Sequence, residues 1–477
     1  MSRRASRASS RNRRGSPSTI DWMPGWLLPA LIVCIAAFQL YAFHWGVITP
    51  DTVFQWKQAL AGRYDDWHPP VTAWLWRQLM PLGPGTAPVL VFDVLLYWAG
   101  AGLFAETLRR SGNGVAAAMV MLVAASPIPL GQLGAILKDP LLAASCLLAA
   151  ALLFAGREAR SPARWAAFIL SFALLVFASA VRINALVATA PLLAAWLPDA
   201  WLARPLRAVM GLVAAVVVLA AGNWAINSVA LHPNRSQPIN SVINFDLAGI
   251  VANGGTNGYP SLDDSGARAM AARCYRPAQF NRPGYPDCDA VEEGLVDYAE
   301  AHHIGTPGLW AHAVAASPLA YAEHRLRHLN ENWRFMVKVV PDDAVYVMSE
   351  PNDLGLQFRS NPASLAVWRA AVAVARSPLG RPATWIAVAL GLLIAGGGGR
   401  SRAVVVGLAL SALFYGGAYL FASVAPDLRY NLWTMLAAAL ALIVWSATLR
   451  EAAVRWPRLL AGALPVVLTI AAELSVS

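Results

Sequence analysis

Long apolar blocks recur along this chain and alternate with short polar segments. The blocks run for about 16 to 24 residues, and about 20 apolar residues in a helix span a hydrocarbon layer of about 30 Å. A helix also satisfies its own backbone polar groups, as lipid surroundings require. The pattern therefore predicts an all-α integral membrane protein. About eleven membrane spans are expected, near residues 26–47, 85–108, 114–133, 140–156, 165–181, 183–198, 207–228, 382–397, 402–422, 431–449 and 457–474.

Composition and charge narrow the class of protein. The chain is 57% hydrophobic and only 13% charged, which is far from the composition of soluble domains. Its net charge of +10 could indicate nucleic-acid binding, but most of the excess is arginine beside the ends of apolar blocks. We interpret that charge as topology and lipid contact, so the expected partner is the bilayer and not nucleic acid.

The arginine-rich loops predict an orientation. If the basic tail is cytoplasmic, alternation of the spans places every arginine-rich short loop on the cytoplasmic side, as the positive-inside rule requires. We therefore expect a multi-pass protein of the bacterial inner membrane with its chemistry on the periplasmic face. The segments left outside are 48–84, 134–139, 229–381 and 423–430, together with the C-terminus.

This pattern divides the chain into four parts. The first twenty residues lack the apolar run of a cleavable signal, so the first span is expected to stay as an anchor. The first outer loop, 48–84, is expected to hold interfacial helices, and the outer insertion to be of mixed structure. The parts are a basic cytoplasmic tail (1–25), an N-terminal transmembrane core (26–228), a periplasmic insertion (229–381) and C-terminal transmembrane helices (382–477).

The periplasmic insertion carries its own candidate features. Cys274 and Cys288 share it, and an oxidising compartment predicts a disulfide between them, with two free thiols as the alternative. Residues 241–250 could form an interfacial helix at the active cleft, and residues 321–328 place basic side chains at helical spacing for lipid phosphates. A scaffold role is the alternative for both stretches.

The first outer loop offers a candidate base. Asp51 directly follows a predicted span, where a rigid element would hold its carboxylate beside a low-dielectric boundary. The alternative is an ordinary helix N-cap, a position where Asp is common. Gln55 and His68 lie in the same loop and are candidates for binding and orienting a substrate.

Cations occur in the other outer segments. Lys138 lies on the side that the positive-inside rule disfavours, and Arg182 and Arg429 fall in two further outer turns. Such cations need anionic partners, either local carboxylates or a phosphate. The local alternatives are a Lys138–Asp139 pair, a structural acid for Arg182 and an Asp427–Arg429 turn. One shared anion site explains all three cations together.

These motifs together resemble a known family. An acid after the first span, Gly-x-Tyr-x-Asp-Trp-His-Pro-Pro over residues 62–70, Lys138-Asp139, Arg182-x-Asn184 and Asp427-x-Arg429-Tyr430 are similar to motifs of the GT-C membrane glycosyltransferases. Among these, the closest type is the polyprenyl-phosphate-sugar-dependent enzymes related to lipid A aminoarabinose transferases and protein mannosyltransferases. The resemblance covers roughly residues 26–228 and 380–450.

The resemblance implies an activity and its participants. The expected reaction is inverting transfer of a hexosyl or pentosyl group from a polyprenyl-phosphate carrier to a lipid-linked glycan, lipid or protein acceptor. Asp51, Asp139 and His68 are then the catalytic candidates, and they are also the ligands for an optional divalent cation. The candidates for binding the carrier phosphate and sugar are Lys138, Arg182, Arg429, Tyr430, Gln55 and Asp427.

The sequence departs from the family in two ways and leaves alternatives open. The acid after the first span is single, which leaves metal dependence open, and the outer domain is an insertion, which leaves the acceptor open. Other classes with many spans and outer charges are a glycolipid transporter or flippase, a glycan polymerase or ligase, and a non-catalytic assembly subunit. A transporter usually binds its substrate at the bilayer midplane near broken helices in matching halves, and no repeated half is visible here.

Overall fold

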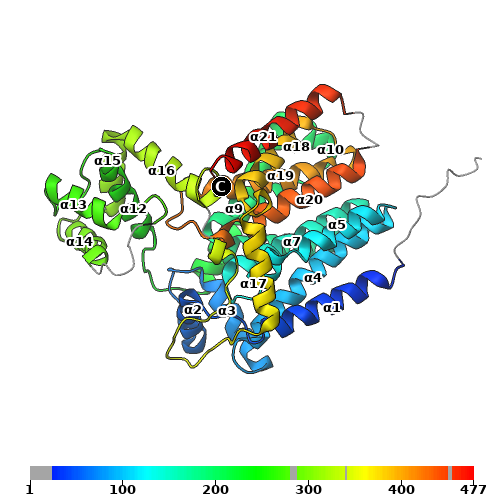
Figure 1. Ribbon diagram of the computed structural model, residues 1–477, viewed down its shortest axis with the longest axis horizontal. Helices are drawn as coiled ribbons and strands as arrows, with labels where there is room; N and C mark the ends of the chain where they lie inside the picture. Colours follow the sequence, from blue (N-terminus) through cyan, green and yellow to red (C-terminus); the bar gives the residue numbers. More distant parts are fainter. Residues whose placement is uncertain (1–23, 280–286, 339–340, 450–453, 477) are drawn as a thin grey trace, which may run out of the picture.

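The computed structural model describes residues 24–279, 287–338, 341–449 and 454–476. Over these residues the fold is α-helical, and the pairings of β type are two isolated bridges, Val47 with Ala135 and Asp65 with Asn234. Figure 1 shows a bundle of long helices with a group of shorter helices projecting from one end. The predicted all-α class agrees with this architecture.

Seven helices in the described residues are long and apolar enough to cross a membrane. All seven coincide with predicted spans. They are α4 (Ala87–Arg110), α7 (Lys138–Glu158), α8 (Ala163–Val181), α11 (Pro205–Trp224, continued to Ala230 by a π turn), α19 (Arg402–Ala418, preceded by a 3-10 turn from Gly399), α20 (Leu432–Thr448, preceded by a 3-10 turn from Leu428) and α21 (Trp456–Leu474).

The other four predicted spans are occupied by shorter apolar helices, so a count of eleven long spans is not reached. These are α1 (Leu27–Ala42), α5 (Gly114–Ala124), α9 (Leu186–Ala194) and α18 (Pro382–Ala395). The block predicted over 114–133 is divided because Pro127 cannot continue α5, and a separate helix α6 (Pro127–Gln132) begins there.

The first outer loop contains two short helices, α2 (Pro50–Ala61) and α3 (Pro70–Leu79). The long outer insertion begins with a group of five helices, at the left of Figure 1. They are α12 (Ile239–Ala252), α13 (Asp264–Cys274), α14 (Asp287–Ala301), α15 (Thr306–Ala316) and α16 (Pro318–Trp333).

The expectation of a mixed insertion was wrong for the described part of residues 229–381, which is helical. Its sequence explains this: Asp263 caps α13 through a hydrogen bond from the Gly266 amide, and α13 is rich in alanine. A further helix, α17 (Pro362–Ala375), returns to the membrane bundle, where Val367 and Ala371 join the main apolar core.

Of the alternatives left open for two stretches of the insertion, the contacts of Asp246 and Arg325 fit the scaffold role. Helix α12 is not interfacial, because Phe245, Asp246 and Leu247 are almost completely buried at the centre of the helix group. Arg325 does not face lipid phosphates, since its side chain is buried and pairs with Asp246 at 2.6 Å. His324 is buried in the same cluster, with Nε2 at 3.0 Å from Asp246.

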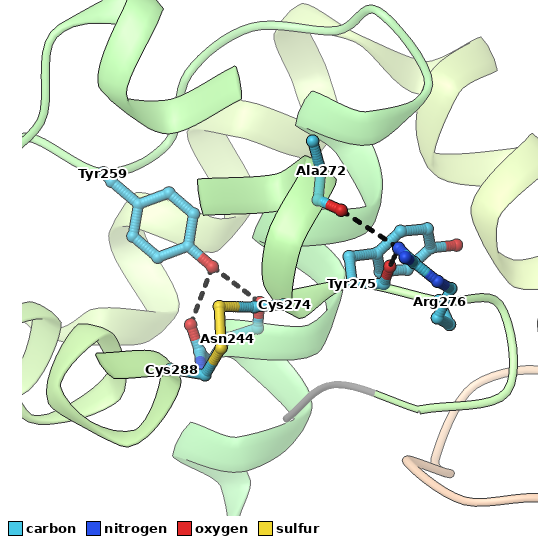
Figure 2. The surroundings of a disulfide bond; sticks show 7 residues. All are labelled: Asn244, Tyr259, Ala272, Cys274, Tyr275, Arg276 and Cys288. Carbon is cyan, nitrogen blue, oxygen red and sulfur yellow. Dashed lines mark hydrogen bonds between the residues drawn. A yellow bond between two sulfur atoms is a disulfide. The ribbon is translucent and has the colours of Figure 1, made fainter. Parts of the chain in front are cut away.

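Cys274 and Cys288 form a disulfide, with 5.6 Å between their Cα atoms. It joins the end of α13 to the start of α14, and both cysteines are buried. Figure 2 shows the Tyr259 hydroxyl beside this bond, donating to the backbone and side-chain oxygens of Asn244 on α12. The disulfide ties α13 to α14, and the Tyr259 contact fixes the loop between α12 and α13 to α12.

Candidate functional site

The candidate residues come from four separate segments and meet at one end of the bundle. Asp51 and Gln55 lie on α2, His68 precedes α3, and Lys138 and Asp139 begin α7. Arg182 follows α8, and the 3-10 turn Leu428–Asn431 before α20 carries Arg429 and Tyr430. Side-chain contacts connect all of these segments, so the outer loops that carry the candidates converge in the structure.

A short backbone pairing brings the first outer loop to the start of α7. The Val47 amide donates to the Gly134 carbonyl at 2.9 Å, and the Ile136 amide donates to the Val47 carbonyl at 3.1 Å. The Thr52 hydroxyl adds a bond of 2.8 Å to the Ile136 carbonyl. Asp51 and Lys138 therefore lie on two segments that are fixed to one another.

Asp51 is not the N-cap of α2. The cap is Thr49, whose hydroxyl accepts from the Thr52 amide while the Thr52 hydroxyl accepts from the Thr49 amide. This reciprocal capping box satisfies the helix start without a carboxylate. The Asp51 side chain, 28% exposed, is free to point into the site, and the capping alternative for Asp51 was wrong.

The carboxylate of Asp51 faces two groups of the site. Its Oδ2 is 3.0 Å from Nη2 of Arg429, and its Oδ1 is 3.7 Å from Nε2 of His68. Gln55 supports the same turn, donating from Nε2 to the Asp51 carbonyl at 3.1 Å. Burial raises the pKa of Asp51, but positive charge from Arg429 and Lys138 outweighs it and holds the pKa below its usual value.

His68 links Lys138 to Asp51. Nζ of Lys138 and Nδ1 of His68 are 2.6 Å apart. A lysine ammonium can only donate, so Nδ1 accepts and the ring proton lies on Nε2, the nitrogen that faces Asp51. Burial, reinforced by the charge of Lys138, lowers the pKa of His68 to about 3, which keeps the ring neutral at physiological pH.

The carboxylate of Asp139 pairs with arginines and not with Lys138. Arg182 forms an ion pair with Asp139, and Nε of Arg429 lies 3.8 Å from its other oxygen. The Asp139 side chain is only 2% exposed, so the pairing offsets a large desolvation cost. The acid expected for Arg182 is present, whereas the predicted alternative of a Lys138–Asp139 pair was wrong.

Arg429 is the most connected cation of the site. Besides Asp51 and Asp139, it contacts Asp427, which accepts from its Nε at 3.0 Å. The predicted Asp427–Arg429 turn is therefore real, and it coexists with the contact to Asp51. One guanidinium thus joins the last outer turn to the first outer loop and to the start of α7.

Aromatic rings form one wall of the site. The guanidinium of Arg182 lies 4.1 Å from the centre of the Tyr430 ring, and Tyr430 stacks on Tyr419 with 5.8 Å between ring centres. Tyr346 is a further ring, 5.9 Å from the guanidinium of Arg429. Sequence reasoning missed Tyr346 and Tyr419, because neither follows a motif and both reach the site only through tertiary packing.

The outer insertion braces the loop that carries Arg429. Arg325 of α16 donates to the Ser423 carbonyl at 2.9 Å, and Nδ2 of Asn431 donates to Oδ1 of Asn332 at 2.8 Å. Both asparagines are completely buried. The sequence left a scaffold role open for Arg325, and its described contacts are with Asp246 and this loop.

Within the described residues, no three His, Cys, Asp or Glu side chains gather in an arrangement suited to a metal ion. Of the three candidate ligands, Asp51 and His68 face each other, whereas Asp139 is held by Arg182 and Arg429. The site as built is a mixed cluster of three cations and three carboxylates, namely Lys138, Arg182, Arg429, Asp51, Asp139 and Asp427.

No protein-family model matches this chain, and no curated protein matches it in sequence. Among solved structures, the chain is similar to the crystal structure of ArnT from Cupriavidus metallidurans bound to undecaprenyl phosphate, at 16% sequence identity and a TM-score of 0.34. The match covers 90% of this chain and 78% of the ArnT chain.

Proposed function

We propose that this protein is an inverting membrane glycosyltransferase that moves a sugar from a polyprenyl-phosphate carrier to an acceptor on the periplasmic face of the inner membrane. The observation that carries the proposal is the contact of the Asp51 carboxylate with Arg429, in a cluster that also contains Lys138 and Arg182. A base beside several cations matches a reaction that removes a proton and releases a phosphate.

The reaction assigns a role to each side of the cluster. The acceptor oxygen or nitrogen forms a bond to the anomeric carbon while the bond from that carbon to the phosphate oxygen breaks. The electron pair stays on the phosphate, and the acceptor proton goes to Asp51. Attack from the face opposite the leaving phosphate inverts the anomeric centre. His68, neutral and with Nε2 at 3.7 Å from Oδ1 of Asp51, positions the carboxylate for this step.

Charge is redistributed within the cluster and not created. Three cations and three carboxylates cancel formally before the donor binds. Proton transfer removes the negative charge of Asp51 at the moment the leaving phosphate gains one. Arg429, which pairs with Asp51 at 3.0 Å, then loses that partner and is released to interact with the phosphate. This exchange stabilises the developing charge without burying a new unpaired ion.

Lys138 is the strongest candidate for a direct phosphate contact. In the part of the chain that the structure describes, no ion pair joins its ammonium to a carboxylate, and its hydrogen-bond partner is the neutral His68. Arg182 and Arg429 by contrast already pair with carboxylates. An ammonium with two donors to spare beside a buried polar cluster favours an anionic ligand.

The donor side can be tested directly with purified protein. A panel of undecaprenyl-phosphate-linked sugars should include one that loses its sugar in the presence of membrane acceptors, releasing undecaprenyl phosphate in equal amount. Lys138→Ala should slow this release at sub-saturating donor roughly 10- to 150-fold, while Lys57→Ala, which breaks an exposed pair with Asp353, serves as the control. Movement of an intact donor across vesicles without release of the sugar would instead establish a transporter.

A further inference from the structure

A cleft of about 400 Å³, lined mostly by polar residues, lies between the first outer loop and the outer insertion. One wall is Trp67, the residue before His68, with 42% of its surface exposed. The other walls come from the segment before α12, from the first turn of α12 and from one face of α14. The lining residues are Trp67, Arg235, Ser236, Gln237, Asn240, Glu292, Glu293, Val296 and Asp297.

The cleft is fixed to the loop that carries His68. The Asp66 amide donates to the Asn234 carbonyl at 3.0 Å, and the Asn234 amide donates to the Tyr64 carbonyl at 2.9 Å. The Ser236 amide adds a bond of 2.5 Å to Oδ1 of Asp66. A molecule seated on Trp67 therefore rests on a wall that is hydrogen-bonded to the segment leading into His68.

The lining has the chemistry of a carbohydrate site. An exposed indole offers a flat apolar face for the C–H face of a sugar ring, while the surrounding carboxylates, amides and guanidinium can bond its hydroxyls. Asn240 adds a buried group, 7% exposed, whose two Nδ2 donors have one described contact, at 3.4 Å from Gln237. Because a contact of 3.4 Å is long for a hydrogen bond, the buried Asn240 amide can donate to a ligand.

The charge of the lining distinguishes among sugars. Glu292, Glu293 and Asp297 oppose a single cation, Arg235. Glu292 is partly engaged, accepting from the Ser241 hydroxyl at 2.9 Å, whereas Glu293 and Asp297 are exposed. An excess of carboxylates in a partly enclosed cleft favours a cationic ligand over a neutral or anionic one.

We infer that this cleft binds the glycan part of the acceptor, and that its acidic wall selects a sugar carrying a free amine. The inference deepens the proposed function and rests on it, because only that function makes the bound glycan an acceptor. Glycan binding to the cleft can nevertheless be tested by itself. The inference separates the two substrates in space: the carrier phosphate at Lys138 and the acceptor glycan over Trp67.

The probes are the glucosamine tetramer and its N-acetylated counterpart, titrated calorimetrically into the full-length protein in nanodiscs. We expect the amine form to bind more tightly and its affinity to fall with added salt. Trp67→Ala should weaken binding about tenfold, as loss of one aromatic contact does. Glu293→Gln and Asp297→Asn, on an exposed helix face, should each weaken it by roughly threefold or more.

Matched controls are Trp74→Ala, an indole of similar exposure on α3 outside the cleft, and Asp264→Asn, an exposed carboxylate on α13. Both should bind like the unmodified protein. The inference is overturned if neither tetramer binds, if the acetylated form binds equally well, or if the cleft variants match the controls.

Undecaprenyl-phosphate binding, measured on the same samples, separates this inference from the proposed function. Loss of tetramer binding in Trp67→Ala with carrier binding intact supports the cleft as a distinct acceptor site. A protein that binds the tetramer in the cleft but releases no sugar from any donor would refute the proposed reaction while leaving the glycan site standing.

Discussion

Oδ2 of Asp51 and Nη2 of Arg429 are 3.0 Å apart, although one residue opens the first outer loop and the other belongs to the turn before α20. The pair joins the earliest and the latest outer segments of the chain. The positive charge keeps the Asp51 carboxylate deprotonated, and a base must be deprotonated before it can receive a proton. Substitutions at this pair are therefore the most direct test of the mechanism.

Asp51→Asn keeps the shape of the side chain but removes the proton acceptor. Turnover should fall roughly 100- to 10,000-fold, the usual worth of general-base catalysis, with little change in donor affinity. Asp427→Asn is the matched control, because Asp427 also contacts Arg429 at 3.0 Å and is 29% exposed, against 28% for Asp51. Its turnover should fall far less. Near-normal transfer by Asp51→Asn, with activity abolished at Asp139 or His68, would move the base elsewhere.

Lys138→Ala and Arg182→Ala should both weaken donor binding but should differ in their effect on the stability of the folded protein. Each removes a charge-assisted contact worth about 1.5 to 3 kcal/mol, so each should weaken donor binding by roughly 10- to 150-fold. Only Arg182→Ala also leaves a buried carboxylate, Asp139, without its main partner, so only that variant should unfold at clearly lower temperature. Carrier binding and thermal unfolding, measured on both variants, check this. Equal loss of stability in the two would contradict the assigned pairings.

His68 should make the stability of the folded protein depend on pH. Its pKa is about 3 in the folded state, against an ordinary value near 6.5, so as the pH falls the unfolded chain takes up a proton first. The free energy of unfolding should therefore decrease as the pH falls from about 6.5 towards 3. The lowered pKa of Asp51 acts in the same direction, but only below its ordinary value of 3.8.

The measurement for His68 is thermal unfolding at a series of pH values between about 7.5 and 4.5. His68→Gln retains a donor and an acceptor but cannot titrate, so its stability should vary less with pH. His232→Gln, at an exposed histidine, is the control and should follow the unmodified protein. Identical pH profiles for His68→Gln and the unmodified protein would show that His68 does not titrate as described.

The orientation of the protein can be established by labelling introduced cysteines in intact cells. A membrane-impermeant reagent should reach a cysteine at Asp264 in the outer insertion and not one at Arg160 between α7 and α8. Cys34 is exposed on α1 and should first be replaced by Ser. Labelling at 160 without labelling at 264 would reverse the orientation and place the site on the cytoplasmic side.

The Cys274–Cys288 disulfide closes a loop with a sequence separation of 14. Replacing both cysteines by Ser should destabilise the outer insertion by about 3 kcal/mol, because the unfolded segment regains the freedom that the bond removes. Limited proteolysis between α13 and α14 reports this locally, and a non-reducing peptide map shows the bond itself. Two free thiols in protein purified without reductant would contradict the pairing.

The sequence by itself determined the membrane class and the approximate helices. Lipid surroundings impose a length and a hydrophobicity on each spanning helix, and both can be read locally. The seven long helices therefore coincide with predicted blocks. The same reasoning predicted too many long spans, because the hydrophobicity of a segment does not reveal where its helix ends. Pro127, for example, divides one apolar block into α5 and α6. We also expected mixed structure in the outer insertion, where alanine-rich segments such as α13 form helices.

The candidate site was predicted as a set of residues but not as a set of pairs. Charged residues at outer helix ends are conspicuous because each is costly there, so Asp51, Lys138 and Arg429 could be singled out from the chain alone. Apart from the local contact of Asp427 with Arg429, their partners were not readable, since pairing depends on which helix ends are neighbours. Only the tertiary structure showed that Arg182 pairs with Asp139 and that Lys138 contacts His68. It also showed that Thr49, and not Asp51, caps α2. Packing also brought in Tyr346 and the cleft beside Trp67, because aromatic rings in loops have no local signal until distant segments fold against them.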